Sequence, residues 1–399
     1  MGYNSLRMIE REISPYLKKL IRKYPVITIT GPRQSGKTYL AKNTLLNYQY
    51  VNLEDLEIRS FANNDPKGFL KKYPGKVIID EIQRAPELTS YIQVITDERK
   101  QNGQFILTGS QNFQIMDTLS QSLAGRTASL TLLPFSFNEI EKKYNKKDFI
   151  DNLIFTGFYP AIYDKNLKPT EMLSNYVSSY VERDLKQLSE IKNLDLFQRF
   201  MVLCAGRVGQ LLNLNNISND LGVSSNTLKE WLSLLRASYI IFLLQPYHPN
   251  VNKRLVKSPK LYFYDVGLAS YLLGIDDSKQ IKSHPLRGQL FENLIIVETL
   301  KHRYNNGLSN NLSFYRDSNA NEIDLIYQIA NKFTAIEIKS TSTIRFDEEY
   351  GKDIFKSLDN IKSIMKEKVN NRVVVYAGDN DYNVQKYKVR NIKSFKSVL

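Results

Sequence analysis

Cysteine, histidine and tryptophan are scarce in this chain of 399 residues, which holds one cysteine, three histidines and one tryptophan. A single cysteine excludes a framework of disulfide bonds and any zinc site built from several thiolates. Three scattered histidines argue against a histidine-rich metal centre. The first residues lack the apolar stretch of a secretion signal, and no apolar run reaches the roughly 18 residues of a membrane span. We therefore expect a cytoplasmic protein in a reducing compartment, with no membrane partner.

Acidic residues are also in deficit, because 41 Asp and Glu stand against 55 Lys and Arg and leave a net charge of +14. Such a surplus attracts phosphate backbones of any sequence, which favours DNA as a partner. A lysine-rich composition without a nucleic acid partner explains the surplus equally well. The hydrophobic content of 42% is enough for buried cores. At about 100–200 residues per domain, the length predicts two to four domains.

Short apolar runs alternate with helical segments in the first third of the chain. A helix is expected over residues 37–46, directly after a loop that contains glycine. Strands are expected at 25–30, 48–53, 76–79, 104–107 and 127–133. This alternation indicates a parallel, doubly wound sheet, and such sheets bind ligands at the carboxyl ends of their strands.

Residues 31–38, Gly-Pro-Arg-Gln-Ser-Gly-Lys-Thr, fit the phosphate-loop pattern G-x-x-x-x-G-K-[ST] in full. Gly31 and Gly36 let the backbone curl so that successive N–H groups face one point, at the positive end of the following helix. In this pattern Lys37 reaches the β- and γ-phosphates, and the Thr38 hydroxyl coordinates Mg²⁺. The residues expected to contact the nucleotide are Gly31, Pro32, Arg33, Gln34, Ser35, Gly36, Lys37, Thr38 and Tyr39.

The strand expected at 76–79 ends in two acids, Asp80 and Glu81. A P-loop ATPase presents its Walker B pair in this way. Asp80 would hold Mg²⁺ through its water shell, and Glu81 would orient and deprotonate the attacking water. A solvated acidic turn is the alternative interpretation, which the phosphate loop upstream disfavours.

Polar residues after the strand at 104–107 can contact the γ-phosphate or the attacking water. The candidates are Thr108, Ser110 and Asn112, of which Ser110 is the one that we assign to the catalytic set. Arg126 either supplies charge to the site of a neighbouring subunit or closes its own site. A shared arginine implies a homo-oligomer. Arg183 is a second candidate, for which an ordinary helical salt bridge is the simpler interpretation.

Several segments together resemble a prokaryotic AAA+-type ATPase family that carries a C-terminal domain of uncharacterised function. The segments that resemble its ATPase motifs are 31–38, 77–83, 107–110 and 122–127. Those that resemble its C-terminal part are 180–184, 262–268 and 288–293. The resemblance implies that the chain binds ATP and Mg²⁺, and it implies little about biological role.

Residues 216–232 have the form of a helix-turn-helix, with Gly222 at the turn. A second helix placed in the major groove of DNA would expose Ser225, Asn226 and Lys229. A winged-helix unit that serves as a lid or as a protein contact fits the same pattern. The face carries few arginines, which argues against sequence-specific reading of bases.

Four residues near the C-terminus form a nuclease-like pattern: Glu292 in a helix, Asp324 in a strand, and Glu337 and Lys339 in the next strand. Residues two apart in a strand face one side, so these groups can gather on one face of a sheet. There they could hold Mg²⁺ and activate water for phosphodiester cleavage, with Lys339 as the catalytic lysine. The order resembles the PD-(D/E)xK nuclease fold. A salt-bridged strand edge is the alternative.

The patterns together predict an α/β chain of four parts. These are a P-loop parallel-sheet ATPase domain over 1–145, a helical lid or connector over 146–195, a winged-helix or helix-turn-helix domain over 196–280, and a restriction-endonuclease-like α/β domain over 281–399. The favoured function is a Mg²⁺-dependent ATPase that acts on DNA or is recruited to it, with a nuclease-like end that either cleaves or only resembles a nuclease. The alternative is a signalling or assembly switch, in which ATP alters a partner surface and the C-terminal part only binds.

Overall fold

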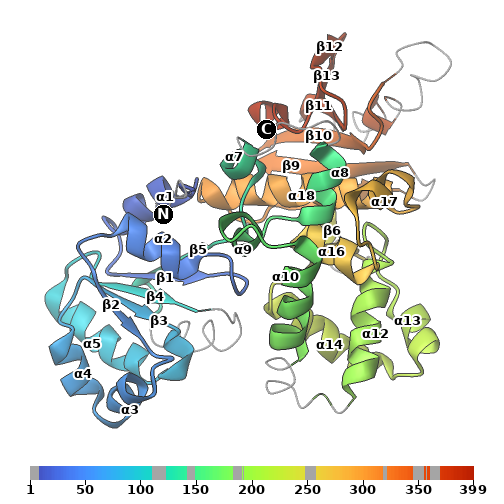
Figure 1. Ribbon diagram of the computed structural model, residues 1–399. Coiled ribbons are helices and arrows are strands. Elements are labelled where there is room, and N and C mark those ends of the chain that lie inside the picture. The colour runs from blue at the N-terminus through green and yellow to red at the C-terminus, as the bar shows by residue number, and fades with distance from the viewer. Residues whose placement is uncertain are drawn as a thin grey trace, which may run out of the picture.

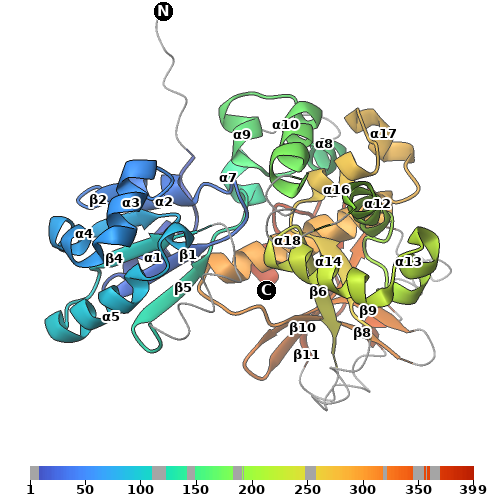
Figure 2. The same cartoon turned by 90° about the horizontal axis from the view of Figure 1, so that it is seen from below.

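Two lobes stand side by side in a computed structural model of the chain, one built on the N-terminal sheet and a larger one that contains most of the remaining residues (Figures 1 and 2). The structure describes residues 9–109, 123–141, 149–182, 191, 193–247, 258–317, 321–344, 355, 357–359 and 369–399.

The helices and strands of the described residues have these bounds. The helices are α1 (Ser14–Leu20), α2 (Lys37–Thr44), α3 (Leu56–Asn64), α4 (Pro66–Lys72), η1 (Ile82–Arg84), α5 (Leu88–Arg99), α7 (Phe137–Ile140), α8 (Phe149–Thr156), α9 (Pro160–Asp164), α10 (Pro169–Tyr176), η3 (Val177–Glu182), α12 (Leu194–Ala205), α13 (Leu214–Leu221), α14 (Ser225–Ala237), α16 (Val266–Leu272), α17 (Ser278–Ser283), α18 (Arg287–Asn305) and η5 (Phe395–Val398). The strands are β1 (Val26–Thr30), β2 (Gln49–Asn52), β3 (Val77–Asp80), β4 (Phe105–Thr108), β5 (Thr127–Thr131), β6 (Ile241–Pro246), β7 (Lys260–Phe263), β8 (Leu312–Arg316), β9 (Glu322–Ile329), β10 (Lys332–Lys339), β11 (Val369–Tyr376), β12 (Tyr382–Val384) and β13 (Tyr387–Arg390).

The N-terminal lobe contains a five-stranded sheet in the order β2-β3-β4-β1-β5. Every neighbouring pair in it is parallel. All residues of β1, β3 and β4 are buried, because separate apolar clusters cover the two faces of the sheet. The predicted parallel α/β sheet is therefore confirmed. Insertion of β4 between β1 and β3 brings the carboxyl ends of three strands together at one edge.

The larger lobe contains an eight-stranded mixed sheet in the order β12-β13-β11-β10-β9-β8-β6-β7. Strands β8, β9 and β10 run antiparallel in turn, whereas β10 and β11 are parallel. The long helix α18 packs against β10, and buried residues lie on nearly all sides of the helix. This arrangement confirms the expectation of an α/β C-terminal region.

Strand pairing and apolar packing both cross residue 280, where we predicted a domain boundary. Strands β6 and β7 come from the predicted helix-turn-helix part, yet β6 pairs with β8 in the C-terminal sheet. One apolar cluster also extends through both parts, from Leu133 to Val398. The sequence shows local periodicity but not which sheet a strand joins, so we did not predict that one sheet would contain strands from both parts.

None of the described helices is long and apolar enough to span a membrane.

Candidate functional site

The phosphate-loop residues lie between the end of β1 and the start of α2. Gly31 has a φ of +141°, and a Cβ there would overlap the backbone oxygen of Leu132. Gly36 has a φ of +91° and lies directly before the first turn of α2. Both positions therefore favour glycine, and the loop curls at the positive end of the helix.

The ammonium group of Lys37 lies inside this loop. Its Nζ donates to the carbonyl oxygens of Gly31 at 3.1 Å and Pro32 at 2.8 Å. Burial lowers the pKa of Lys37 to about 8, although the nearby Glu81 and Asp80 act in the opposite direction. Both bonded partners are neutral carbonyls, so phosphate oxygens can replace them without breaking an ion pair.

Asp80 accepts hydrogen bonds from side chains of three different elements. The hydroxyl groups of Thr38 and Tyr50 each donate to Oδ2 at 2.8 Å, and the Thr108 hydroxyl donates to Oδ1. Thr108, one of the three polar candidates and the last residue of β4, lies beside the acidic strand end. Tyr50 was not predicted, because its contact depends on β2 lying next to β3.

Glu81 follows Asp80 with a φ of +59°, a left-handed conformation that non-glycine residues seldom adopt. The Gln83 side chain donates to its carboxylate. Burial raises the pKa of Glu81, partly offset by Lys37. A carboxyl group with a raised pKa is a better base near neutral pH. Strain at such a residue is common at functional sites.

Arg11, which lies before α1, contacts the backbone of the phosphate loop. Its guanidinium group donates to the backbone oxygens of Ser35 and Leu133, both at 2.7 Å, and forms an ion pair with Glu139 at 3.0 Å. The arginine is buried, with 4% of its surface exposed. No motif marks it in the sequence, because its partners are 24 to 128 residues away.

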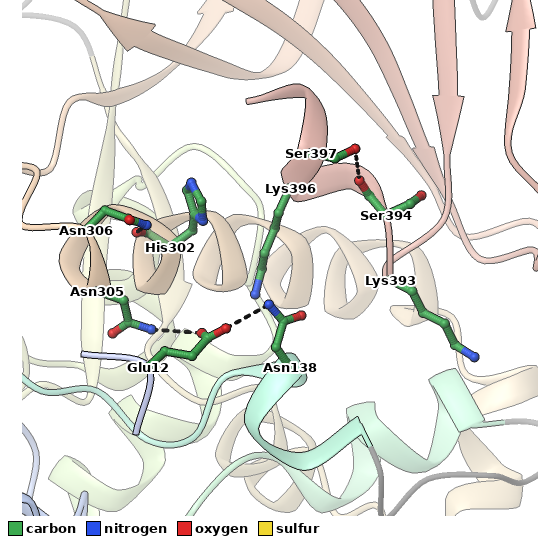
Figure 3. Close-up of a pocket in the computed structure, with 9 residues that line it drawn as sticks. All are labelled: Glu12, Asn138, His302, Asn305, Asn306, Lys393, Ser394, Lys396 and Ser397. Atoms are coloured by element: carbon green, nitrogen blue, oxygen red, sulfur yellow. Dashed lines mark hydrogen bonds between the residues drawn. The ribbon is translucent and has the colours of Figure 1, made fainter. Parts of the chain in front are cut away.

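Glu12, the next residue, connects Glu139 to the larger lobe. Its backbone N–H donates to Glu139 at 2.7 Å, and its carboxylate accepts from Asn138 at 2.8 Å and Asn305 at 3.1 Å. Figure 3 shows Glu12 between these two asparagines. A cavity of about 500 Å³ opens here between the lobes. It is lined by Glu12, Asn138, His302, Asn305, Asn306, Lys393, Ser394, Lys396 and Ser397.

A buried ion cluster on α18 joins the lobes beside this cavity. Glu298 forms ion pairs with Lys301 at 2.9 Å and Lys396 at 2.8 Å, and accepts from the backbone N–H of Phe137 at 2.8 Å. Burial alone would raise the pKa of Glu298, but the two lysines outweigh it and lower that pKa to about 2. Lys301 also donates to the backbone oxygen of Phe135 at 2.7 Å. The segment that leaves the N-terminal lobe is therefore held by charged groups of α18.

A second contact between the lobes reaches the strand that leads into the phosphate loop. The hydroxyl group of Tyr239 donates to Oγ1 of Thr30 at 3.1 Å in a buried position. Thr30 is the last residue of β1 and directly precedes Gly31. Tyr239 of the larger lobe thus contacts the residue that directly precedes the loop.

One interpretation of Arg126 is wrong, namely that it closes its own site. Residue 127 pairs with Val26 at the amino end of β1, whereas the phosphate loop follows the carboxyl end. The guanidinium group forms an ion pair with Asp97 at 2.5 Å. The parallel register puts the length of β5 between Arg126 and the nucleotide edge. A contribution to a neighbouring subunit stays a prediction. Ser110, Asn112 and Arg183 lie outside the described residues.

The helix-turn-helix candidate consists of α13 and α14, joined at Gly222 with a φ of +65°. The Ser224 hydroxyl caps α14 by accepting from the backbone N–H of Thr227. Asn226 and Lys229 are exposed on α14. The two following strands belong to the shared sheet and do not form a separate wing.

The four nuclease-like residues lie near one another at one end of the C-terminal sheet. The Asp324 carboxylate accepts from the backbone N–H of Ile338 at 2.7 Å, and Lys339 forms an ion pair with Glu337 at 3.0 Å. Burial and the charge of Asp324 raise the pKa of Glu337 to about 8. Burial and Asp324 likewise raise the pKa of Glu292 to about 7. The Asp324 carboxylate is therefore close enough to repel the charged form of both glutamates.

A residue that we did not predict, Lys260 of β7, enters this cluster. Its ammonium group forms ion pairs with Glu292 at 3.0 Å and Glu322 at 2.5 Å. The hydroxyl group of Tyr262 also donates to Glu292, at 2.5 Å. In the part of the chain that the structure describes, no group of three or more His, Cys, Asp or Glu side chains is arranged to hold a metal ion.

Comparison with protein families divides the chain into three matched segments. Residues 23–141 match the AAA domain family, 147–279 match a domain of unknown function (DUF8612), and 287–395 match another domain of unknown function (DUF4143). The first segment holds the phosphate loop, the acidic pair and the parallel sheet described above. The N-terminal region has an AAA-type P-loop ATPase fold. This fold indicates ATP binding and hydrolysis.

Relatives and solved structures similar to the chain add little about its role. An uncharacterized protein of Mycobacterium tuberculosis is 28% identical over 350 residues, which are 85% of this chain and 76% of the relative. One of Haemophilus influenzae is 24% identical, over 84% of this chain and 87% of the relative. The Walker-type ATPase of Pyrococcus abyssi is 15% identical over 66% of this chain and 96% of its own, with a TM-score of 0.46. The RuvB Holliday junction branch migration motor of Thermotoga maritima covers 59% of this chain and 89% of its own, with 18% identity and a TM-score of 0.31.

Proposed function

We propose that the chain is a Mg²⁺-dependent ATPase whose nucleotide state acts on the larger lobe. The observation that carries this proposal is the convergence of Thr38 and Thr108 on the two carboxylate oxygens of Asp80, beside the curled loop. These hydroxyl and carboxylate oxygens are donors of the kind that Mg²⁺ prefers.

Each residue has a distinct task in this proposal. The backbone N–H groups of the loop and the Lys37 ammonium bind and orient the phosphates, after Lys37 leaves its carbonyl partners. Thr38 and Asp80 hold Mg²⁺, which neutralises charge on the β- and γ-phosphates when it is bound. Glu81 takes a proton from the attacking water. Thr108 orients the Asp80 carboxylate.

Phosphate release from ATP by the purified full-length chain tests this proposal. We expect turnover that requires Mg²⁺ and disappears in Lys37→Ala, because the phosphates lose their cation. Lys19→Ala is the matched control, since Lys19 is exposed on α1, and it should turn over ATP like the wild type. Absence of any heat of ATP binding by calorimetry in Mg²⁺ would refute the assignment.

DNA is the partner that we propose for the larger lobe, because the net charge is +14 and α14 exposes Asn226 and Lys229. Binding to phosphates releases counterions and weakens steeply with salt. We expect double-stranded DNA to raise ATP turnover and the DNA affinity to fall between 50 and 200 mM salt, by about tenfold or more. Lys229→Ala should reduce both effects, whereas an exposed lysine of the other lobe, such as Lys19, should not.

A switch without DNA is the second candidate, and the contacts of Arg11 and Tyr239 favour it. They connect the phosphate loop to the larger lobe, so that nucleotide binding can alter a partner surface. ATP turnover that ignores DNA, together with DNA binding that lacks a salt slope, would favour this candidate. A protein partner captured only in the presence of a non-hydrolysable ATP analogue would then support it.

A further inference from the structure

The C-terminal carboxylate cluster already contains its own cations. Four carboxylates gather there, from Glu292, Glu322, Asp324 and Glu337. Lys260 and Lys339 form ion pairs within the group, and Arg316 approaches Glu322 at 3.1 Å from its edge. Three cations thus lie among the four carboxyl groups.

Lys260 is the most deeply placed of these cations. Its side chain is 4% exposed, whereas those of Lys339 and Arg316 are 36% and 43% exposed. Its ammonium group lies 3.0 Å from Glu292 and 2.5 Å from Glu322, and therefore occupies the space between these two carboxylates.

We propose that Lys260 is the resident cation of this cluster and excludes a divalent metal ion from it. A metal ion held by the residues of the nuclease-like pattern would be bound by Glu292 together with Asp324 or Glu337. The Oε1 atom of Glu292, however, is shared by the Lys260 ammonium at 3.0 Å and the Tyr262 hydroxyl at 2.5 Å. The remaining carboxylates meet Lys339 and a backbone N–H. The donor set does not fit Mg²⁺, so phosphodiester cleavage that depends on Mg²⁺ has no metal site in this cluster.

The strand that carries Lys260 explains why it is held there. Residue 260 is paired with Leu244 of β6 and bridged to Leu211, so its backbone is anchored on both sides. Removal of the lysine would leave buried carboxylates without their counter-charge, an arrangement that attracts cations from solvent. This inference is independent of the ATPase assignment, because no residue of the N-terminal lobe takes part.

Binding of Mn²⁺ to the nucleotide-free full-length chain, measured by electron paramagnetic resonance, tests the proposal. The signal that counts is the part that Glu292→Gln abolishes, since this subtracts any ion at the ATP site. We expect Lys260→Met to show such a signal at Mn²⁺ concentrations at least tenfold below any at which the wild type or Lys260→Arg shows one. Lys332→Met, at an exposed position of β10, is the matched control and should resemble the wild type.

Thermal stability provides a second readout. Lys260→Met should melt at a lower temperature than the wild type and recover with Mn²⁺ or Mg²⁺, but not with NaCl of equal ionic strength. Where Lys260→Met does not fold, the double variant Lys260→Met/Glu322→Gln removes one charge of each sign and should show the same gain of Mn²⁺ binding. Mn²⁺ binding by the wild type that depends on Glu292 and is as tight as that of Lys260→Met would overturn the proposal. Plasmid cleavage that Lys339→Ala abolishes, or a folded Lys260→Met without added Mn²⁺ binding, would overturn it equally.

Discussion

Two of the buried lysines that the structure describes, Lys37 and Lys260, stand beside carboxylates and have different bonded partners. Lys37 is 6% exposed and bonds to the neutral oxygens of Gly31 and Pro32, although Asp80 and Glu81 lie close by. Lys260 is 3% exposed and bonds directly to two glutamates. Burial dominates in the first case and lowers the pKa to about 8, whereas attraction dominates in the second and raises the pKa.

The difference distinguishes a lysine that exchanges partners from one that keeps them. A buried ammonium group that is bonded to neutral oxygens is not neutralised by them, so it can form an ion pair with an incoming triphosphate. A buried ammonium between carboxylates is already neutralised, and its removal leaves charges uncompensated. The first arrangement favours ligand binding, and the second stabilises the fold.

The same substitution at both lysines should produce opposite results. Lys37→Met should lower ATP affinity at least ~100-fold while leaving the free energy of unfolding nearly unchanged, because a buried charge gives way to an apolar chain of similar volume. Lys260→Met should keep ATP affinity and lose about 3–5 kcal/mol of stability, the usual effect of breaking a buried ion pair. Urea unfolding and calorimetry with ATP check both. Equal stability losses would contradict the comparison.

Glu81 of the ATP site and Glu337 of the C-terminal cluster allow the same comparison between two buried carboxyl groups. Glu81→Gln keeps the shape but cannot accept a proton, so ATP should bind normally and be hydrolysed about 100-fold more slowly, the scale of a lost catalytic base. Glu337→Gln in the C-terminal cluster is the matched control and should leave turnover unchanged. A steady-state assay of phosphate release measures both variants. Normal turnover by Glu81→Gln would remove it from the catalytic set.

The N-terminal lobe could be predicted from the sequence because its signals are local. The expected strands at 25–30 and 104–107 match Val26–Thr30 and Phe105–Thr108 within a residue, since each is a short apolar run closed by a polar or glycine-rich turn. The spacing within 31–38 likewise specifies the loop without knowledge of strand order.

The remaining site residues depend on contacts between distant parts of the chain. Tyr50 contacts Asp80 only because β2 and β3 are neighbours, and Arg11 and Tyr239 act across 24 and 209 residues. Lys260 escaped the sequence analysis for the same reason, because its strand seemed to belong to a different domain from Glu292. A pattern of residue types lacks the sheet order that brings such groups together.

The lowered pKa of Lys37 predicts how ATP affinity depends on pH. The pKa is about 8 in the free protein, and phosphate contacts should raise it, so binding takes up protons between the two values. ATP affinity should therefore be constant below pH 8 and fall above it, by up to about tenfold per unit. Calorimetry at pH 8.5 in two buffers of different ionisation enthalpy should reveal the proton uptake. Its absence would mean that Lys37 is already fully protonated.

The smallest effect is expected where neutral groups meet, at the hydrogen bond from Tyr239 to Thr30. Tyr239→Phe removes a neutral donor from a buried acceptor that also lies 3.5 Å from Oγ1 of Thr131. We expect a loss of about 0.5–1.5 kcal/mol in the free energy of unfolding and a change in ATP turnover of less than about threefold. Tyr24→Phe at the surface is the matched control and should stay within about 0.5 kcal/mol of the wild type. A loss as large as that of Lys260→Met would show that the charges of the bonded groups do not decide how much a buried contact contributes here.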